Sequence, residues 1–328
     1  MGAGAIGCYL GGRLQAAGAQ VHFVGRPRVL EALRTQGLGL SDLDGWRVQL
    51  AAADLALHAQ VPEDMAPALV LLTVKSGATA EAAAELAARL PAGTPVISMQ
   101  NGVSNARIAQ QQAPGLRVWP GMVPYNVAEL APGRFHRGTA GALAAQDDAM
   151  LRGWLPLFQA AGLDLHLHAD MRSVQWGKLL LNLNNPVNAL SGLPLRRQLL
   201  DRELRRCTAA LIDEALGVLK AAGIAPARVA PVRPAALPRL MRLPTLLFRV
   251  VAARSLRIDA KARSSMADDL ALDRPTEVDA LCGEVVSLAR SVGGQAPRNA
   301  RMTALVKDWP QTRQAWTGAA LRQALQAP

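Results

Sequence analysis

Apolar residues are arranged differently in the two halves of the chain. In the first half, continuous apolar runs typical of buried strands alternate with segments of helical spacing. The expected strands are 20–25, 46–50, 68–74, 95–99, 117–123, 135–144 and 163–168, and the expected helices between them are 79–90 and 151–160. Strands that alternate with helices are typical of a parallel sheet with helices on both faces.

From Met171 onward, apolar residues recur at helical spacing, and no strand pattern of comparable strength occurs. The expected helices are 171–191, 203–222, 266–272, 277–291 and 299–307. We therefore predict an α/β protein of two domains. Residues 1–168 form a Rossmann-type, doubly wound parallel sheet domain, and residues 169–328 form an all-helical, all-α domain.

The first residues match the pattern GxGxxG, with Gly2, Gly4 and Gly7 at the start of an apolar helix. The next expected strand completes the turn, helix and strand of a dinucleotide-binding unit. Glycines let main-chain N–H groups approach a pyrophosphate closely, and the helix N-terminus adds partial positive charge. We expect this turn, including Ala5 and Ile6, to bind the cofactor. A glycine-rich helix start without a ligand is the alternative interpretation.

The end of that strand carries Arg26, followed by Pro27 and Arg28. Units that bind NAD normally have an acid at this point, which holds the ribose diol. An arginine instead suits the 2′-phosphate of NADP, which an acid would repel. The pattern predicts NADP as the cofactor, and an ordinary surface arginine is the alternative.

The start of the chain does not fit this unit completely. A first strand should precede Gly2, yet the chain begins at Met1. In the usual order this strand is central, and both of its neighbours lose a ladder of hydrogen bonds without it. The sequence therefore predicts that the first strand is missing, as in a chain with a misplaced start or a truncation.

The apolar helix expected over 171–191 carries Lys178, Asn182 and Asn185 among its leucines. At about 100° per residue, the two asparagines of a continuous helix lie within roughly 40° and 20° of the lysine. An ammonium among leucines needs partners or a chemical purpose, because burying an unpaired cation is costly. Pro186 removes a helix hydrogen bond from the Asn182 carbonyl and favours a bend there. A capped helix end whose lysine reaches water is the alternative.

Polar residues also stand at strand ends and helix starts. Lys75 and Asn101 follow two expected strands, at the edge where doubly wound sheets bind ligands. Ser265 and Glu277 stand just before or at the start of two expected helices. Ser264 or Ser265, and Thr276, are also suitable helix caps, which would explain these positions without a ligand.

These motifs together resemble the ketopantoate reductase (2-dehydropantoate 2-reductase) family. In chain order they are Gly-Ala-Gly-Ala-Ile-Gly from Gly2, Thr73-Val74-Lys75, Gln100-Asn101-Gly102, Lys178 with Asn182, Ser264-Ser265-Met266 and Thr276-Glu277. Each motif is weak alone, but as an ordered set that runs to about Asn299 they are specific. The resemblance implies NADPH-dependent reduction of 2-dehydropantoate to (R)-pantoate in pantothenate biosynthesis.

The resemblance also implies roles for individual residues. Lys178 matches the catalytic acid of the family, Glu277 holds the lysine, and the second domain binds the substrate. The residues implied in substrate binding are Asn182, Asn185 and Ser265, and those implied in cofactor binding beside the glycine turn are Arg26, Lys75 and Asn101. No metal is required.

Two positions depart from the family pattern. The family has a second asparagine eight residues after the lysine, where this chain has Pro186, with Asn185 one residue earlier. An asparagine that contacts substrate in family members is replaced by Ala262. A reductase of a different 2-oxo acid is therefore an alternative. A noncatalytic NADP-binding sensor is a second, separate alternative.

Composition limits the possible partners. The net charge is +11, but the arginines are spread along helices and aromatic residues make up only 4%, which argues against a nucleic-acid partner. No apolar stretch is long enough to span a membrane, nothing resembles an export signal, and the three cysteines lack metal spacing. We expect a cytoplasmic enzyme with a small-molecule substrate and no membrane partner, and a homodimer is an open possibility.

Overall fold

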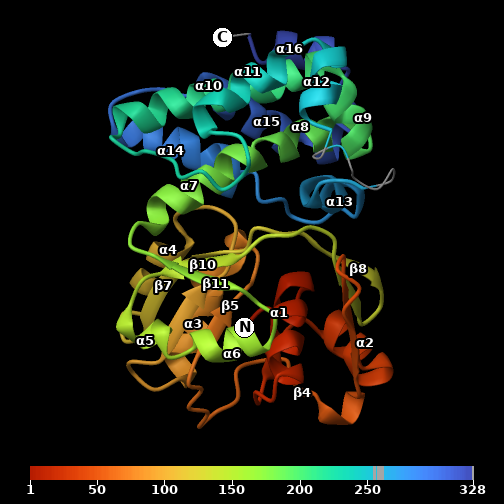
Figure 1. Cartoon of the computed structure of the whole chain (residues 1–328). Coiled ribbons are helices and arrows are strands. Elements are labelled where there is room, and N and C mark those ends of the chain that lie inside the picture. The colour runs from red at the N-terminus through yellow and green to blue at the C-terminus, as the bar shows by residue number, and fades with distance from the viewer. Residues whose placement is uncertain (254–255, 257–261, 327–328) are drawn as a thin grey trace. The chain divides into compact units, whose positions relative to one another are not determined.

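The computed structural model describes residues 1–253, 256 and 262–326. The chain divides into two compact units, Met1–Met171 and Arg172–Pro328. Figure 1 shows strands and helices in the first unit and helices in the second. The predicted fold class, a Rossmann-type domain followed by a helical domain, is confirmed.

The main sheet of the first unit has five strands in the order β11-β10-β7-β6-β5. Their bounds are β5 Val70–Leu72, β6 Pro95–Ser98, β7 Arg117–Met122, β10 Leu143–Gln146 and β11 Leu165–His168. β5, β6 and β7 are parallel neighbours, whereas β10 is antiparallel to β7 and parallel to β11. The associated helices are α3 Thr79–Arg89, α4 Asn105–Gln112, α5 Ala149–Arg152 and α6 Leu155–Ala160. The sheet is therefore mixed, not wholly parallel.

A second, two-stranded parallel sheet pairs β1 (His22–Val24) with β4 (Ala56–His58). The main chain of Met1 and Gly2 joins it to β5. The Met1 amine donates to the Leu71 carbonyl at 3.0 Å, and the Gly2 N–H donates to the Val24 carbonyl at 2.9 Å. Met1 and Gly2 thus lie between β1 and β5 and hydrogen-bond to both. This is the place where a Rossmann-type sheet normally has its first strand, the strand that the sequence predicts to be missing.

A third sheet has the order β3-β2-β9-β8. Its strands are β2 Leu38–Asp42, β3 Arg47–Leu50, β8 Val127–Ala131 and β9 Arg134–Arg137. The single strand predicted over 135–144 is wrong, because β9 and β10 belong to different sheets and glycines at 138 and 141 separate them. Strands β2, β4 and β8 were not predicted from their weak apolar patterns.

A buried arginine attaches the first helix, α1 (Ala5–Ala16), to this third sheet. Arg13 lies 3.7 Å above the ring of Trp46 and donates to Asp42 at 3.1 Å and to the Ala161 carbonyl at 2.7 Å. A buried cation needs such partners, because an unpaired one is costly. Helix α1, which follows the glycine turn, is therefore held from its far end. Helix α2 (Pro27–Gln36) follows β1.

The second unit has helices and no strand among its described residues. Its α-helices are α7 Met171–Asn182, α8 Asn184–Ser191, α9 Leu195–Leu200, α10 Arg202–Ala221, α11 Leu237–Arg242, α12 Thr245–Val251, α13 Ser265–Ala271, α14 Glu284–Ser291, α15 Pro297–Thr312 and α16 Gly318–Ala324. The longest, α10, is capped by Asp201 and packs against α11, α15 and α16. Among the described residues, every helix is too short or too polar to cross a membrane.

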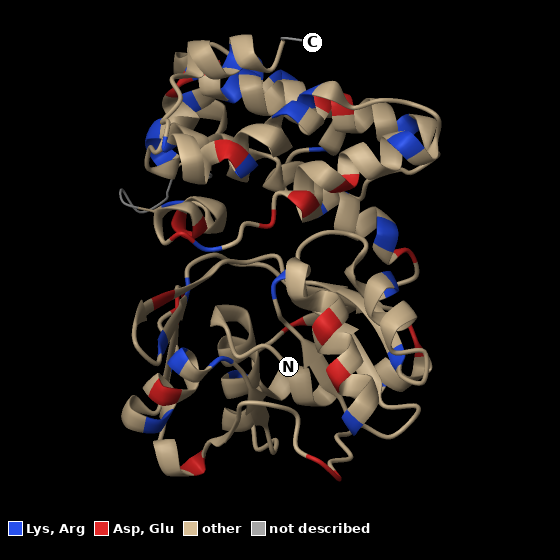
Figure 2. Ribbon diagram, turned by 180° about the vertical axis from the view of Figure 1, so that it is seen from behind, with Lys and Arg blue, Asp and Glu red and all other residues tan. Residues whose placement is uncertain are grey.

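Basic and acidic residues are interspersed along both units in Figure 2. The chain has excess positive charge, and several of its arginines are held in ion pairs. Arg28 contacts Glu129 at 2.9 Å, and Arg206 and Arg322 contact the two oxygens of Glu203 at 2.8 and 2.7 Å. Exposed pairs of this kind contribute at most about 1 kcal/mol each to stability.

Candidate active site

The glycine turn is built by close main-chain approaches. Gly2 has a φ of +101°, and a side chain there would meet the main chain of Val74 at 2.5 Å. A Cβ on Gly7 would overlap the Gly2 carbonyl oxygen and approach the Thr73 hydroxyl at 2.6 Å. That hydroxyl donates to the Gly2 carbonyl at 2.8 Å. The turn is thereby pressed against the end of β5, which only glycine at these two positions allows.

Gly4 serves a different purpose in the same turn. It is exposed, and an added Cβ would meet nothing within 4 Å. It precedes α1, whose first N–H groups receive no side-chain cap from this residue. Ala5, Ile6 and Gly7 form this first turn. An uncapped helix start below open space suits an anion such as a pyrophosphate.

Arg26 lies beside the glycine turn. Gly25, the residue before it, packs so closely on Ala3 that a Cβ there would lie 2.6 Å from the Ala3 Cβ. Arg26 then stands at the N-cap position, directly before α2, and is exposed. Arg28, which the sequence also suggested for a phosphate, is instead held by both oxygens of Glu129 at 3.2 and 2.9 Å. The geometry therefore favours Arg26 over Arg28 as the phosphate ligand.

Lys75 and Asn101 follow β5 and β6 as predicted, and their two loops are joined. The Ser76 hydroxyl donates to the Asn101 carbonyl at 3.0 Å, so the residue after Lys75 contacts Asn101 directly. Because β5 also contacts the glycine turn, the structure brings these two loops and the turn to one edge of the sheet. Sequence reasoning placed these residues at that edge correctly.

A buried polar network beneath the two loops was missed from the sequence. Asn105 accepts from Thr79 at 2.8 Å and donates to Ser76 at 3.2 Å. Gln100 donates to Thr79 at 2.7 Å and to the Val74 carbonyl at 2.9 Å. Asn105 and Thr79 are both almost fully buried. The only sequence signal was that they are polar residues at the starts of helices, which capping alone would explain.

In the second unit, Lys178 and Glu277 come close enough to interact. Burial lowers the pKa of Lys178 to about 8, and the Glu277 carboxylate opposes this by raising it. Lys178 lies on α7 and is half-buried. Its neighbours in the sequence, Trp176, Leu179 and Leu180, are buried. The predicted combination of an apolar setting and an acidic neighbour is therefore present.

The helix that carries Lys178 is not continuous, contrary to the prediction for 171–191. It breaks at Leu183, so α7 ends at Asn182 and α8 begins at Asn184. Pro186 in the first turn of α8 accounts for the break, because it cannot donate to the Asn182 carbonyl. Asn182 keeps its place one turn after Lys178. The angle calculated for a continuous helix does not apply to Asn185, which belongs to α8.

Ser264 and Ser265 have separate positions at the start of α13. Ser264 is buried and caps the helix, since its hydroxyl accepts from the Ala267 N–H at 3.2 Å. Ser265, the first helical residue, is exposed. The cap explanation thus covers Ser264 and leaves Ser265 available to a ligand.

The helix predicted to start at Glu277 starts later. Glu277 is half-buried in a segment without regular secondary structure, and a π-helical turn, Asp279–Gly283, precedes α14. Thr276 is not its cap, because the residue at that position is Val278. Single π-helical turns within helices are rare and are found often at functional sites.

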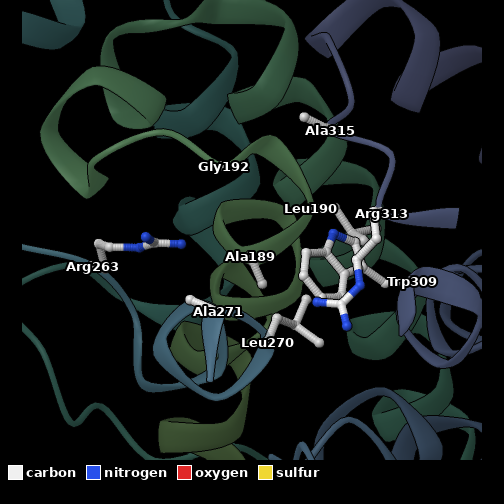
Figure 3. Close-up of a pocket in the computed structure, with 9 residues that line it drawn as sticks. All are labelled: Ala189, Leu190, Gly192, Arg263, Leu270, Ala271, Trp309, Arg313 and Ala315. Atoms are coloured by element: carbon white, nitrogen blue, oxygen red, sulfur yellow. The ribbon is translucent and has the colours of Figure 1, made fainter. Parts of the chain in front are cut away.

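A separate cavity of about 100 Å³ lies within the second unit (Figure 3). Apolar residues of α8, α13 and α15 line it, among them Ala189, Leu190, Leu270 and Trp309. Two arginines, Arg263 and Arg313, also line it. Arg313 lies over the Trp309 ring at 4.5 Å and contacts Asp273 at 2.5 Å. None of the predicted site residues lines this cavity.

Comparison with known proteins decides the family. Residues 1–148 match the family described as ketopantoate reductase PanE/ApbA, and residues 170–309 match its C-terminal domain. The chain belongs to the ketopantoate reductase family. A 2-dehydropantoate 2-reductase from Mesorhizobium japonicum is 29% identical over 93% of this chain and 95% of its own length. One from Halobacterium salinarum is 28% identical over 88% and 90%. The chain is therefore an oxidoreductase of this type.

Solved structures agree. A PanE/ApbA family ketopantoate reductase from Ralstonia eutropha superimposes with a TM-score of 0.78 at 27% identity, covering 95% of this chain and 98% of that one. D-mandelate dehydrogenase, solved with NADH and anilino(oxo)acetate, shares the fold with a TM-score of 0.73 at 17% identity, covering 100% and 98%. The family and the fold together indicate a nicotinamide cofactor.

Proposed function

We propose that this protein reduces 2-dehydropantoate to (R)-pantoate with NADPH, the reductive step of pantothenate biosynthesis. The observation that carries the proposal is that the half-buried Lys178 lies between buried apolar residues of its helix and interacts electrostatically with the Glu277 carboxylate. Family membership supports the reaction, and the similarity to 2-dehydropantoate 2-reductases supports the substrate. We expect the enzyme to act in the cytoplasm.

Lys178 acts as the general acid in this proposal. NADPH, when bound, supplies the hydride that reduces the ketone carbon. The Lys178 ammonium stabilises the negative charge that develops on the ketone oxygen and donates a proton to it. A pKa of about 8 suits this role, because the amine is still protonated at neutral pH yet gives up its proton readily. Glu277 favours the charged form of the lysine.

The substrate is held by side chains of the second unit. Asn182, one turn after Lys178, and the exposed Ser265 offer amide and hydroxyl groups that suit the hydroxyl and carboxylate of a 2-oxo acid. Asn185 is a third candidate, on α8. Ala262 precedes α13 and offers only a methyl group, so it contributes no polar contact to the substrate.

The first unit holds the cofactor in this proposal. The open space above Gly4 and the uncapped start of α1 fit a pyrophosphate, and Ala5, Ile6 and Gly7 supply N–H groups. The exposed Arg26 would bind the 2′-phosphate that distinguishes NADPH from NADH. Lys75 and Asn101, at the neighbouring strand ends, complete the set.

Reduction of a different 2-oxo acid is the second candidate, favoured by Ala262 and by Pro186 at a position where family members have asparagine. A panel of 2-oxo acids decides between the two, with NADPH oxidation followed at the nicotinamide absorbance band. We expect the highest kcat/KM for 2-dehydropantoate. Faster turnover of another acid would change the substrate, and NADPH binding without turnover of any acid would indicate a noncatalytic sensor.

A further inference from the structure

The segment before α13 is attached to α8 and α9 by three hydrogen bonds. The Ser264 N–H donates to Asn188 Oδ1 at 2.9 Å, and the Ser264 hydroxyl donates to the Asn185 carbonyl at 3.3 Å. The Leu195 N–H donates to the Ala262 carbonyl at 2.8 Å. These contacts join residues that are far apart in the sequence, and they hold Ser264, the residue that caps α13.

Asn188 contributes to this attachment with both ends of its amide. Its Oδ1 accepts from Ser264, and its Nδ2 donates to the Leu193 carbonyl at 2.9 Å. The side chain has 0% exposure, so no water can replace either bond. A carboxylate would keep the acceptor and lose the donor, and an alanine would lose both. Asparagine is therefore well suited to bridge the end of α8 and the start of α13.

Helix α13 depends on such contacts for its position. It has seven residues, which is too short for an isolated helix to be stable in water. Met266 and Ala267 near its start and Leu270 near its end are buried, and Leu270 and Ala271 also border the cavity in Figure 3. Packing at that end is therefore incomplete. The polar attachment at the start of α13 therefore adds to apolar packing in holding the helix in place.

We infer that Asn188 is a positioning residue, which places Ser265 for the substrate by holding Ser264. The inference rests on the proposed function, in which Ser265 binds the 2-oxo acid. Ser265 is exposed and directly follows Ser264, so any movement of the cap moves the Ser265 hydroxyl with it. Asn188 itself is fully buried and acts only through α13.

Steady-state kinetics of the full chain test this inference. Asn188→Ala should raise the KM for 2-dehydropantoate about tenfold, the scale of a lost buried hydrogen bond, and change kcat less than about twofold. NADPH affinity should not change. Asn188→Asp keeps the acceptor for Ser264 and should raise KM less than Asn188→Ala does, which provides a second variant if the alanine form folds poorly.

A double-mutant cycle identifies the residue through which Asn188 acts. In a Ser265→Ala background, Asn188→Ala should add little further increase in KM. Asn299→Ala is the matched control, because Asn299 is equally buried but bonds Glu214 and the Leu211 carbonyl, away from α13. Independent effects of Asn188→Ala and Ser265→Ala, or an equal rise in KM from Asn299→Ala, would overturn the inference.

Hydrogen exchange separates this inference from the proposed function, because it needs no turnover. The Ala267 and Asp268 N–H groups donate to the hydroxyl and carbonyl of Ser264. They should exchange faster in Asn188→Ala and at the normal rate in Asn299→Ala. Unchanged exchange in Asn188→Ala overturns the inference whatever the activity is. Absence of turnover in the unmodified protein overturns the proposed function instead.

Discussion

The two candidate sites of this protein use different parts of the chain. The glycine turn of the first unit is made of main chain, where Gly2 and Gly7 allow close packing and Gly4 leaves open space. The Lys178 region of the second unit is made of side chains from segments that are distant in sequence, as Glu277 and Ser265 illustrate. Main-chain N–H groups at a helix start are enough to bind a pyrophosphate, whereas a specific reaction needs particular side chains.

This difference predicts how each site responds to substitution. A change in the glycine turn should alter cofactor binding or stability and leave the acid chemistry intact. A change in the lysine region should alter turnover or substrate binding and leave the cofactor bound. Four tests of this separation are given below, in order of decreasing expected effect.

Replacement of Lys178 by alanine should have the largest effect. Turnover should fall by roughly two or more powers of ten, because a general acid acts mostly in the transition state. NADPH affinity, measured by fluorescence titration, should be retained. Near-normal turnover would show that the lysine is an ordinary side chain that reaches water, and failure to fold would show that its pairing with Glu277 is structural.

Replacement of Arg26 by glutamate should act on the other site. We expect a loss of about 1–3 kcal/mol in NADPH affinity, the scale of a charge-assisted hydrogen bond, with little change for NADH. Arg28→Glu is the control, because Arg28 is already held by Glu129. If Arg26→Glu weakened both cofactors equally, Arg26 would not be the residue that distinguishes them.

Alanine at Gly7 and at Gly4 should separate the two uses of glycine within the turn. Gly7→Ala overlaps the Gly2 carbonyl, so it should lower the free energy of unfolding by about 1–3 kcal/mol. Gly4→Ala meets no atom in the protein and should unfold normally, yet weaken NADPH binding by occupying the open space. Denaturant unfolding and cofactor titration of both variants give the comparison, and normal NADPH binding by Gly4→Ala would place the pyrophosphate elsewhere.

The pH dependence should show the smallest but most specific effect. Because burial lowers the Lys178 pKa to about 8, the protonated acid is lost as pH rises through 8, and the reduction rate should fall there. The reverse oxidation needs the neutral amine and should rise through the same pH. Glu277→Gln removes an interaction that raises this pKa, so both changes should move to lower pH. A profile unmoved by Glu277→Gln would exclude this coupling.

Much of the first unit could be predicted from sequence because its signals are local. The glycine spacing, the apolar strands and the polar residues that follow them are each contiguous, and parallel strands bring their carboxyl ends to one edge. Lys75 and Asn101 were placed correctly for this reason. Strands β2, β4 and β8 were missed because they lack a continuous apolar run.

The sequence alone determined the fold class, the glycine turn and the unusual setting of Lys178, since each depends on residue type and short spacing. Only the tertiary structure decided which residues meet. In the tertiary structure Arg28 pairs with Glu129, and the Ser264 N–H donates to Asn188. The helix predicted around Lys178 is interrupted at Leu183. Such contacts depend on how distant segments pack, and a buried polar side chain takes its partner from that packing, not from its neighbours in the chain.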